Sequence, residues 1–253
     1  MGVVLDYARR EGKVGEMLGR LMNGYFLDPA EASPHWIGGE HGIREAACPA
    51  CGKRLLLHLS LDMEAAEFAG LGCPWTRLPV LFCTRCVLHH EQFAYRLRSA
   101  DTIEILRSAE GTPELNAKWL EYWTEAGFSD VLDKVPVKLR PIHPRLQMLF
   151  DAVNMDAKID ESCEDELFEL TGESRASHAL PRPYLNQVFG SPMRRQGVRD
   201  PACLHCRSAG PTMYPLALLL NDDKRGFKLT LDCYHLLCFV CAQCWSVTVD
   251  CIL

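Results

Sequence analysis

The fold is decided by Cys48-Pro49-Ala50-Cys51, which is followed after thirty-one residues by Cys83-Thr84-Arg85-Cys86. The arrangement returns as Cys203-Leu204-His205-Cys206 and, thirty-four residues later, Cys241-Ala242-Gln243-Cys244. A two-residue gap turns the backbone so that both sulfurs of a pair face one point, and two pairs supply the four thiolates of tetrahedral Zn²⁺. The sequence therefore predicts two structural zinc ions, whose ligands are Cys48, Cys51, Cys83 and Cys86 at the first site and Cys203, Cys206, Cys241 and Cys244 at the second.

The alternative to metal is that these residues form disulfides or remain buried free thiols. The chain has 13 cysteines in 253 residues, and the stretch after Met1 reaches the charged residues Asp6 and Arg9 too soon for a secretory signal. We therefore expect a cytoplasmic protein, and in a reducing compartment paired cysteines indicate metal ligands. No apolar run is long enough to predict a membrane span.

The second site contains an ambiguity, because Cys238 stands three residues before Cys241 and offers another pair. The register of the repeat favours Cys241 and Cys244, since Phe82-Cys83 then matches Val240-Cys241. Cys238 alternates with apolar neighbours and is predicted to be a core thiol. A site closed by four sulfurs has no position open to water, so it would stabilise the fold without catalysing a reaction.

Alternating hydrophobicity predicts a β-rich chain. Leu55, Leu57, Leu59 and Leu61 alternate with polar residues, as expected of a half-buried strand. Further strands are predicted at 78–82, 93–98, 102–107, 135–142, 226–231, 234–240 and 245–252. Pro136 and Pro141 lack backbone donors, which predicts that 135–142 lies at a sheet edge.

Helical periodicity or capping signals predict helices at 3–23, 112–127 and 145–154. The segment 156–173 is strongly acidic and allows two interpretations. It is either a solvated face or mobile loop between the halves, or a contact surface for a basic partner.

The second half of the chain repeats the first, which indicates internal duplication. Val188-Phe189-Gly190-Ser191 matches Trp36-Ile37-Gly38-Gly39 at an offset of about 152 residues. Leucines 216, 218 and 220 match leucines 57, 59 and 61 at an offset of 159 residues, and the Cys241 pair matches the Cys83 pair at an offset of 158 residues. We therefore predict an N-terminal helix (1–32), a first zinc β-module with inserted helices (33–155), an acidic segment and linker (156–183), and a second zinc β-module (184–253).

The net charge and the absence of common catalytic motifs bear on which classes of function we expect. The net charge of −6 disfavours a general nucleic-acid binder, which usually has a basic surplus. The chain has no G-x-S-x-G, H-E-x-x-H or G-x-G-x-x-G motif. We therefore expect a protein that is not an enzyme, although residues from distant segments could still form a catalytic site in the fold.

The order of these motifs resembles the YwqG-like bacterial proteins and their distant relatives of the programmed-cell-death-two type. In both halves a glycine turn, a C-x-x-C pair, a leucine-alternating strand and a second C-x-x-C pair follow one another, over about Pro34 to Arg98 and Tyr184 to Cys251. The resemblance implies that the eight cysteines are structural ligands in a duplicated β-rich fold. It also implies a role as a chaperone for a ribosomal protein or as an immunity protein beside a toxin.

Two departures from that family pattern bear on the partner. Glu40-His41 follows the first glycine turn where the family usually has Pro, and the central zinc-finger insertion of many eukaryotic members is absent. We expect a mainly β fold with flanking helices (α+β), built from two pseudo-repeated modules packed together. The expected function is a zinc-stabilised module that sequesters a protein partner of basic character; the alternatives are a nucleic-acid-binding zinc ribbon and an enzyme without a recognisable motif.

Overall fold

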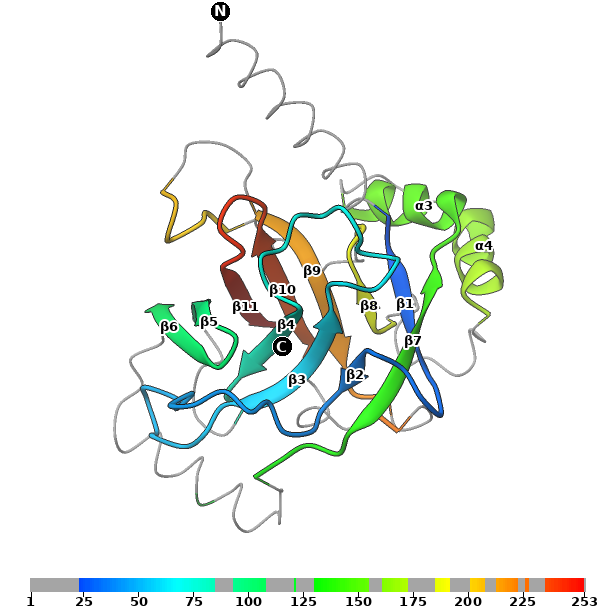
Figure 1. Ribbon diagram of the computed structural model, residues 1–253. Helices are drawn as coiled ribbons and strands as arrows, with labels where there is room; N and C mark the ends of the chain where they lie inside the picture. Colours follow the sequence, from blue (N-terminus) through cyan, green and yellow to red (C-terminus); the bar gives the residue numbers. More distant parts are fainter. Residues whose placement is uncertain are drawn as a thin grey trace, which may run out of the picture.

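A computed structural model describes residues 23–84, 93–107, 121, 130–154, 161–172, 185–191, 201–207, 213–222, 226–227 and 235–252. These residues form one curled antiparallel sheet of eleven strands in the order β4-β3-β2-β7-β1-β8-β9-β10-β11-β5-β6 (Figure 1). The strands are β1 (Tyr25–Pro29), β2 (Trp36–Ile37), β3 (Leu56–Asp62), β4 (Arg77–Phe82), β5 (Phe93–Ser99), β6 (Thr102–Arg107), β7 (Val135–Pro141), β8 (Gln187–Val188), β9 (Met213–Leu220), β10 (His235–Cys241) and β11 (Val247–Ile252). The predicted mainly β fold with flanking helices is confirmed.

Strand β1 lies at the middle of the sheet, between β7 and β8. Successive side chains of β1 face opposite sides of the sheet. Phe26 is therefore buried in the cluster under the helices, and Leu27 is buried in the cluster inside the curl. The assignment of 1–32 to an N-terminal helix is therefore wrong for residues 25–29, because pairing on both sides fixes them as a strand. Residues 1–22 lie outside the described part of the chain.

Strand β7 is also interior, which corrects the prediction that its prolines confine it to an edge. It pairs with β2 through residues 135–136 and with β1 through residues 137–141. The two partners are staggered, so Pro136 and Pro141 stand where one pairing ends. A missing N–H therefore removes only a terminal hydrogen bond.

The strand order is similar on the two sides of the β7–β1 pair. A short strand is followed by two longer ones on each side, β2-β3-β4 on one and β8-β9-β10 on the other. Each side has a bulge at the matching position, His58 in β3 and Leu216 in β9, which the pairing registers skip. Leu59 and Ala217, which follow these bulges, lie 158 residues apart, as do Cys83 and Cys241. The strand offset is thus 158 rather than 159.

The match between the two glycine turns also differs by one residue from the match predicted from the sequence. Ile37 pairs with Leu59, and Val188 pairs with Ala217, so the turns match at an offset of 151 rather than 152. Gly38 and Phe189 then occupy the same place, and both have positive φ, 68° and 53°. The N–H of each donates to the carbonyl of the bulge residue, His58 or Leu216.

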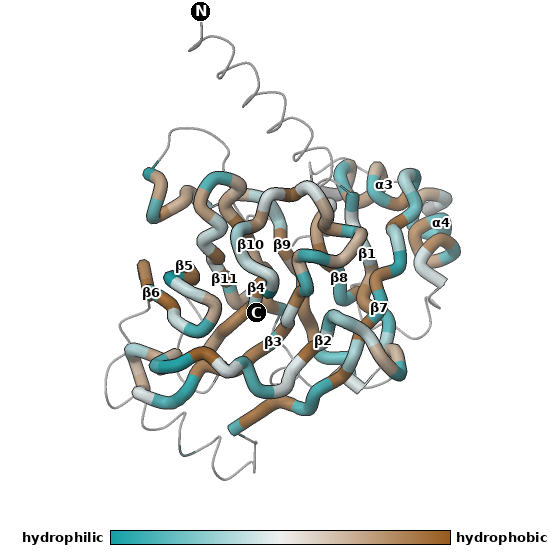
Figure 2. The backbone as a smooth tube through the Cα atoms, viewed as in Figure 1, coloured by the Kyte–Doolittle hydropathy of each residue, from teal (hydrophilic) through white to brown (hydrophobic). Residues whose placement is uncertain are grey.

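The main core fills the inside of the curl, and the apolar stretches follow the strands (Figure 2). Two helices, α3 (Pro144–Asn154) and α4 (Glu161–Thr171), pack beside β1 through Leu146, Phe150 and Leu167. α3 confirms the helix predicted at 145–154. Spanning a bilayer would need a longer and more apolar helix than any formed by the described residues.

The acidic segment contributes α4 rather than a loop alone. Leu167 and Phe168 are buried, whereas Asp165 and Glu169 are exposed. Because β1 pairs with β8, the two predicted modules join in one continuous sheet instead of packing as separate bodies. The predicted helix at 112–127, apart from residue 121, and most of the predicted strand at 226–231 lie outside the described residues.

Candidate metal sites

The second cysteine group brings together four sulfur atoms from two loops. Cys203 and Cys206 lie on the loop before β9, Cys241 ends β10, and Cys244 lies in the turn before β11. The Sγ atoms of Cys203 and Cys244 are 3.6 Å apart and those of Cys206 and Cys241 are 3.8 Å apart; all four lie within 4.8 Å of one another. Zn–S bonds of about 2.3 Å give a tetrahedron with edges of about 3.8 Å, so this group can hold a metal ion.

The first group brings together three of its four predicted ligands. The Sγ atoms of Cys48, Cys51 and Cys83 lie within 4.8 Å of one another, and the Cys51–Cys83 distance is 3.7 Å. Cys86 lies outside the described residues. The seven described ligands form no disulfides, and the contact distances are far longer than the S–S bond of about 2.05 Å. The three sulfurs therefore match the spacing of the second group.

A common turn directs the sulfurs of each described pair. The N–H four residues after the first cysteine donates to that cysteine's carbonyl: Gly52 to Cys48 (2.8 Å), Arg207 to Cys203 (3.1 Å) and Trp245 to Cys241 (2.8 Å). The donor residues have φ of 69°, 48° and 58°. Glycine adopts this conformation freely, but Arg207 and Trp245 each adopt it at a cost of about 1 kcal/mol. The surrounding structure therefore holds two of these turns against local preference.

Cys238 is not among the four clustered sulfurs. Successive residues of β10 face opposite sides of the sheet. Cys238 packs in the main core inside the curl, whereas Cys241 packs in a separate cluster with Cys203. Burial raises the pKa of the Cys238 thiol. The structure thus places Cys238 on the face away from the four-sulfur group.

Two thiols of the second group, Cys206 and Cys244, have pKa values shifted in opposite directions. Burial and the neighbouring thiols raise the pKa of Cys206 to about 12. Hydrogen bonding to Cys241, and then to Ser246, lowers the pKa of Cys244 to about 4. The neighbours therefore favour the thiolate of Cys244 over that of Cys206, and a bound divalent cation would stabilise both thiolates together.

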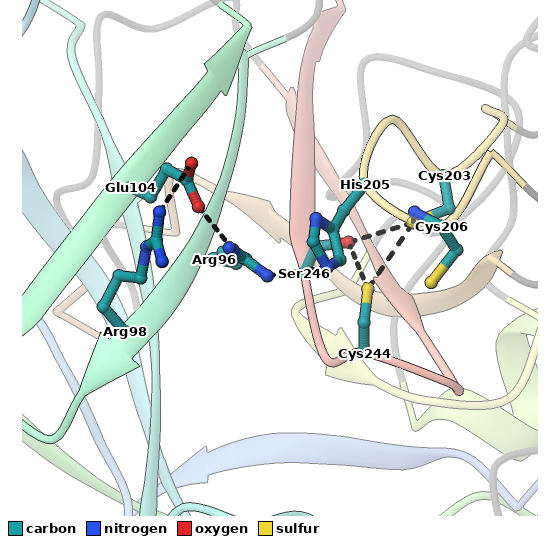
Figure 3. A network of polar contacts seen from close by, with 8 residues as sticks. All are labelled: Arg96, Arg98, Glu104, Cys203, His205, Cys206, Cys244 and Ser246. Atoms are coloured by element: carbon teal, nitrogen blue, oxygen red, sulfur yellow. Dashed lines mark hydrogen bonds and ion pairs between the residues drawn. The ribbon is translucent and has the colours of Figure 1, made fainter.

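His205 makes a contact that sequence reasoning missed. Its Nε2 lies 2.6 Å from Nη1 of Arg96, a residue of β5 (Figure 3). The Nε of Arg96 also donates to Glu104 of β6 at 2.5 Å. The sequence identified His205 only as a residue inside a pair, and no spacing pattern links it to position 96.

Comparison with known proteins finds no matching family model, no matching curated protein and no matching solved structure. The candidate sites therefore rest on their own geometry. Their sulfur atoms are spaced for tetrahedral coordination, and the second group supplies all four ligands from the described residues.

Proposed function

We propose that the protein is a non-enzymatic, zinc-stabilised module that binds and sequesters a protein partner. The observation that carries the zinc part is the four-sulfur group, whose contacts of 3.6–3.8 Å match a tetrahedron around Zn²⁺. Four thiolates would complete the coordination of the ion, so a site of this kind contributes folding free energy. In small zinc peptides that contribution is on the order of 10 kcal/mol.

We further propose that the two sites arose by duplication of one β-module. The support is the constant offset of 158 residues, which relates Leu59 to Ala217 and Cys83 to Cys241. The matching bulges and glycine turns support the same relation. This proposal would place Cys86 as the fourth ligand of the first site, because Cys244 stands 158 residues after it.

The partner-binding part rests on the surface formed by α3 and α4. The exposed carboxylates of α4 include Asp165 and Glu169, while Leu167 anchors the helix to the core. Glu166 forms a two-pronged ion pair with Arg145 of α3, at 2.9 Å for both hydrogen bonds. This pair holds the two helices together, while Asp165 and Glu169 are exposed on α4.

A hollow of about 440 Å³ adjoins the same helix α3. Its lining includes Tyr25, Ile142, Met148 and Asp151. Met148 is 60% exposed and is the exposed large hydrophobic residue of the described chain. A hollow that is lined by both apolar and polar side chains, among them the carboxylate of Asp151, fits a partner that presents an apolar side chain within a basic segment. Such a partner suits an immunity protein or a dedicated chaperone of the YwqG-like kind.

The test is recovery of the partner with the intact protein as bait in native lysate. A second bait carries Asp165→Lys and Glu169→Lys, and it serves as the matched control. A basic protein recovered at one copy per bait, and depleted on the second bait, would support the proposal. Recovery of nucleic acid instead, with binding that weakens steeply as salt rises, would favour the zinc-ribbon alternative.

A further inference from the structure

The second metal group is bordered by a residue from the other half of the chain. Strand β5 pairs with β11 through Tyr95 and Val247, which brings the next residue of β5, Arg96, beside the turn that contains Ser246. The hydroxyl oxygen of Ser246 lies 3.3 Å from the Sγ atoms of both Cys203 and Cys244. Arg96 therefore lies next to the sulfur group because of backbone pairing between distant strands.

Arg96 is held on both sides. Its guanidinium can only donate, so its 2.6 Å contact makes Nε2 of His205 the acceptor. On the other side, Nε of Arg96 donates to Glu104, which also pairs with Arg98 at 3.0 Å. The side chain of Arg96 is only 22% exposed. Figure 3 shows this line of contacts running from the β5–β6 hairpin to the cysteine loop.

We propose that Arg96 is a positioning residue for the second metal site. Its contact orients His205 and so fixes the loop that carries Cys203 and Cys206. Four thiolates and one Zn²⁺ have a net charge of −2, which the single positive charge of the adjacent guanidinium partly offsets. Groups that orient and neutralise metal ligands in this way affect metal affinity about tenfold or more when they are removed.

Only the second site has side chains in the positions of His205 and Ser246 that can accept hydrogen bonds. The place of His205 is taken by Ala50 in the first group, and the place of Ser246 corresponds to Leu88. Neither alanine nor leucine can accept a hydrogen bond through its side chain. The first ion is therefore an internal reference for the second within each molecule.

The experiment measures zinc release to an excess of a coloured chelator from the full-length protein, after the zinc content of each variant has been determined. In Arg96→Met, which retains the apolar stem, one ion is expected to leave about tenfold faster and the other at the wild-type rate. Arg96→Lys should restore part of the difference. Arg98→Met is the matched control, because Arg98 binds the same carboxylate without touching His205, and it should release both ions normally.

His205→Ala should accelerate release of the same ion. The double variant with Arg96→Met should release this ion no faster than either single variant. Wild-type release of both ions from Arg96→Met, or equal acceleration of both, would overturn the role of Arg96 while leaving zinc binding intact. The inference rests on the zinc of the proposed function, so a wild-type protein that carries no zinc would overturn both. Partner binding is measured separately and does not enter this test.

Discussion

The hydroxyl of Tyr95 accepts a hydrogen bond from the backbone N–H of Leu81 at 2.9 Å. It also donates one to the carbonyl of Pro79 at 2.5 Å. Tyr95 belongs to β5 and the other two residues to β4, which are not neighbours in the sheet order. One fully buried side chain thus ties the β4 end of the sheet to a strand near the opposite end and holds the curl closed.

Tyr95→Phe is expected to destabilise the protein by about 2–4 kcal/mol, because it leaves two buried backbone groups without their partner. The ring is retained, so the loss reports on the hydroxyl alone. Urea unfolding of both proteins at neutral pH measures the difference. A loss below about 0.5 kcal/mol would show that the hydroxyl does not hold the curl.

Ligand choice at the second site can be tested with two serine variants. Cys244→Ser is expected to reduce zinc from about two ions per chain to one, because it removes a member of the sulfur group. Cys238→Ser should keep both ions and cost only about 1–2 kcal/mol of core stability. Metal analysis by emission spectroscopy distinguishes them. Equal zinc loss in the two variants would place Cys238 in the site.

His58 makes stability depend on pH. Burial lowers its pKa to about 3, so the folded protein holds the ring neutral, whereas the unfolded chain takes up a proton near pH 6.5. The stabilisation is therefore complete above pH 6.5 and is lost as the pH falls toward 3. His58→Leu, which introduces the residue found at the matching bulge, should reduce the loss between pH 7.5 and 5.5 by about 1.4 kcal/mol.

The test of His58 is urea unfolding at both pH values, with zinc content measured in every sample so that metal loss is not mistaken for protonation. If the variant and the wild type lose the same stability over this range, His58 does not provide the pH dependence.

The two glycines Gly38 and Gly42 provide a matched pair for backbone strain. Both have positive φ, but a Cβ at Gly38 would lie 2.0 Å from the carbonyl oxygen of Asp133, whereas nothing lies within 4 Å at Gly42. Gly42→Ala should cost about 1 kcal/mol and Gly38→Ala more than about 3 kcal/mol. Thermal unfolding of both variants measures this order. Similar costs would mean that the turn at Gly38 can move aside.

The acidic face of α4 is expected to accelerate partner association. Reversing Asp165 and Glu169 to Lys should slow association at low salt and flatten its salt dependence, because exposed charges at an interface act mainly on the association rate. Glu166 is retained because it binds Arg145. Reversal of Glu40 and Glu45, two exposed residues elsewhere, is the control for net charge. Equal association rates for both double variants and the wild type would make α4 a structural helix only.

Local patterns were sufficient to predict much of this fold. The apolar residues of β3 and β4 predicted both strands from the sequence. The segment of β3 was expected to be half-buried, but residues 56–61 are all buried, because both faces of this strand are covered. The cysteine spacing predicted the second sulfur group because two residues between cysteines restrict the turn. In both cases the information lies within about ten residues.

The features that the sequence did not predict depend on pairing between strands that are far apart in the chain. β1 is only five residues long, and it is a strand because residues 137–141 and 187–188 flank it. The interior place of β7 follows from the stagger of its partners, which no local signal encodes. The contact between Arg96 and His205 likewise depends on β5 pairing with β11.

The central position of β1 has a consequence for the order in which the chain can fold during synthesis. Both partners of β1, the first strand among the described residues, lie more than a hundred residues further along the chain, in β7 and β8. Closing such long loops before any contact forms is entropically costly and slows folding. A ribosome must therefore deliver most of the polypeptide before β1 can pair with β7 and β8, and until then β1 stays exposed to chaperones and to unwanted association.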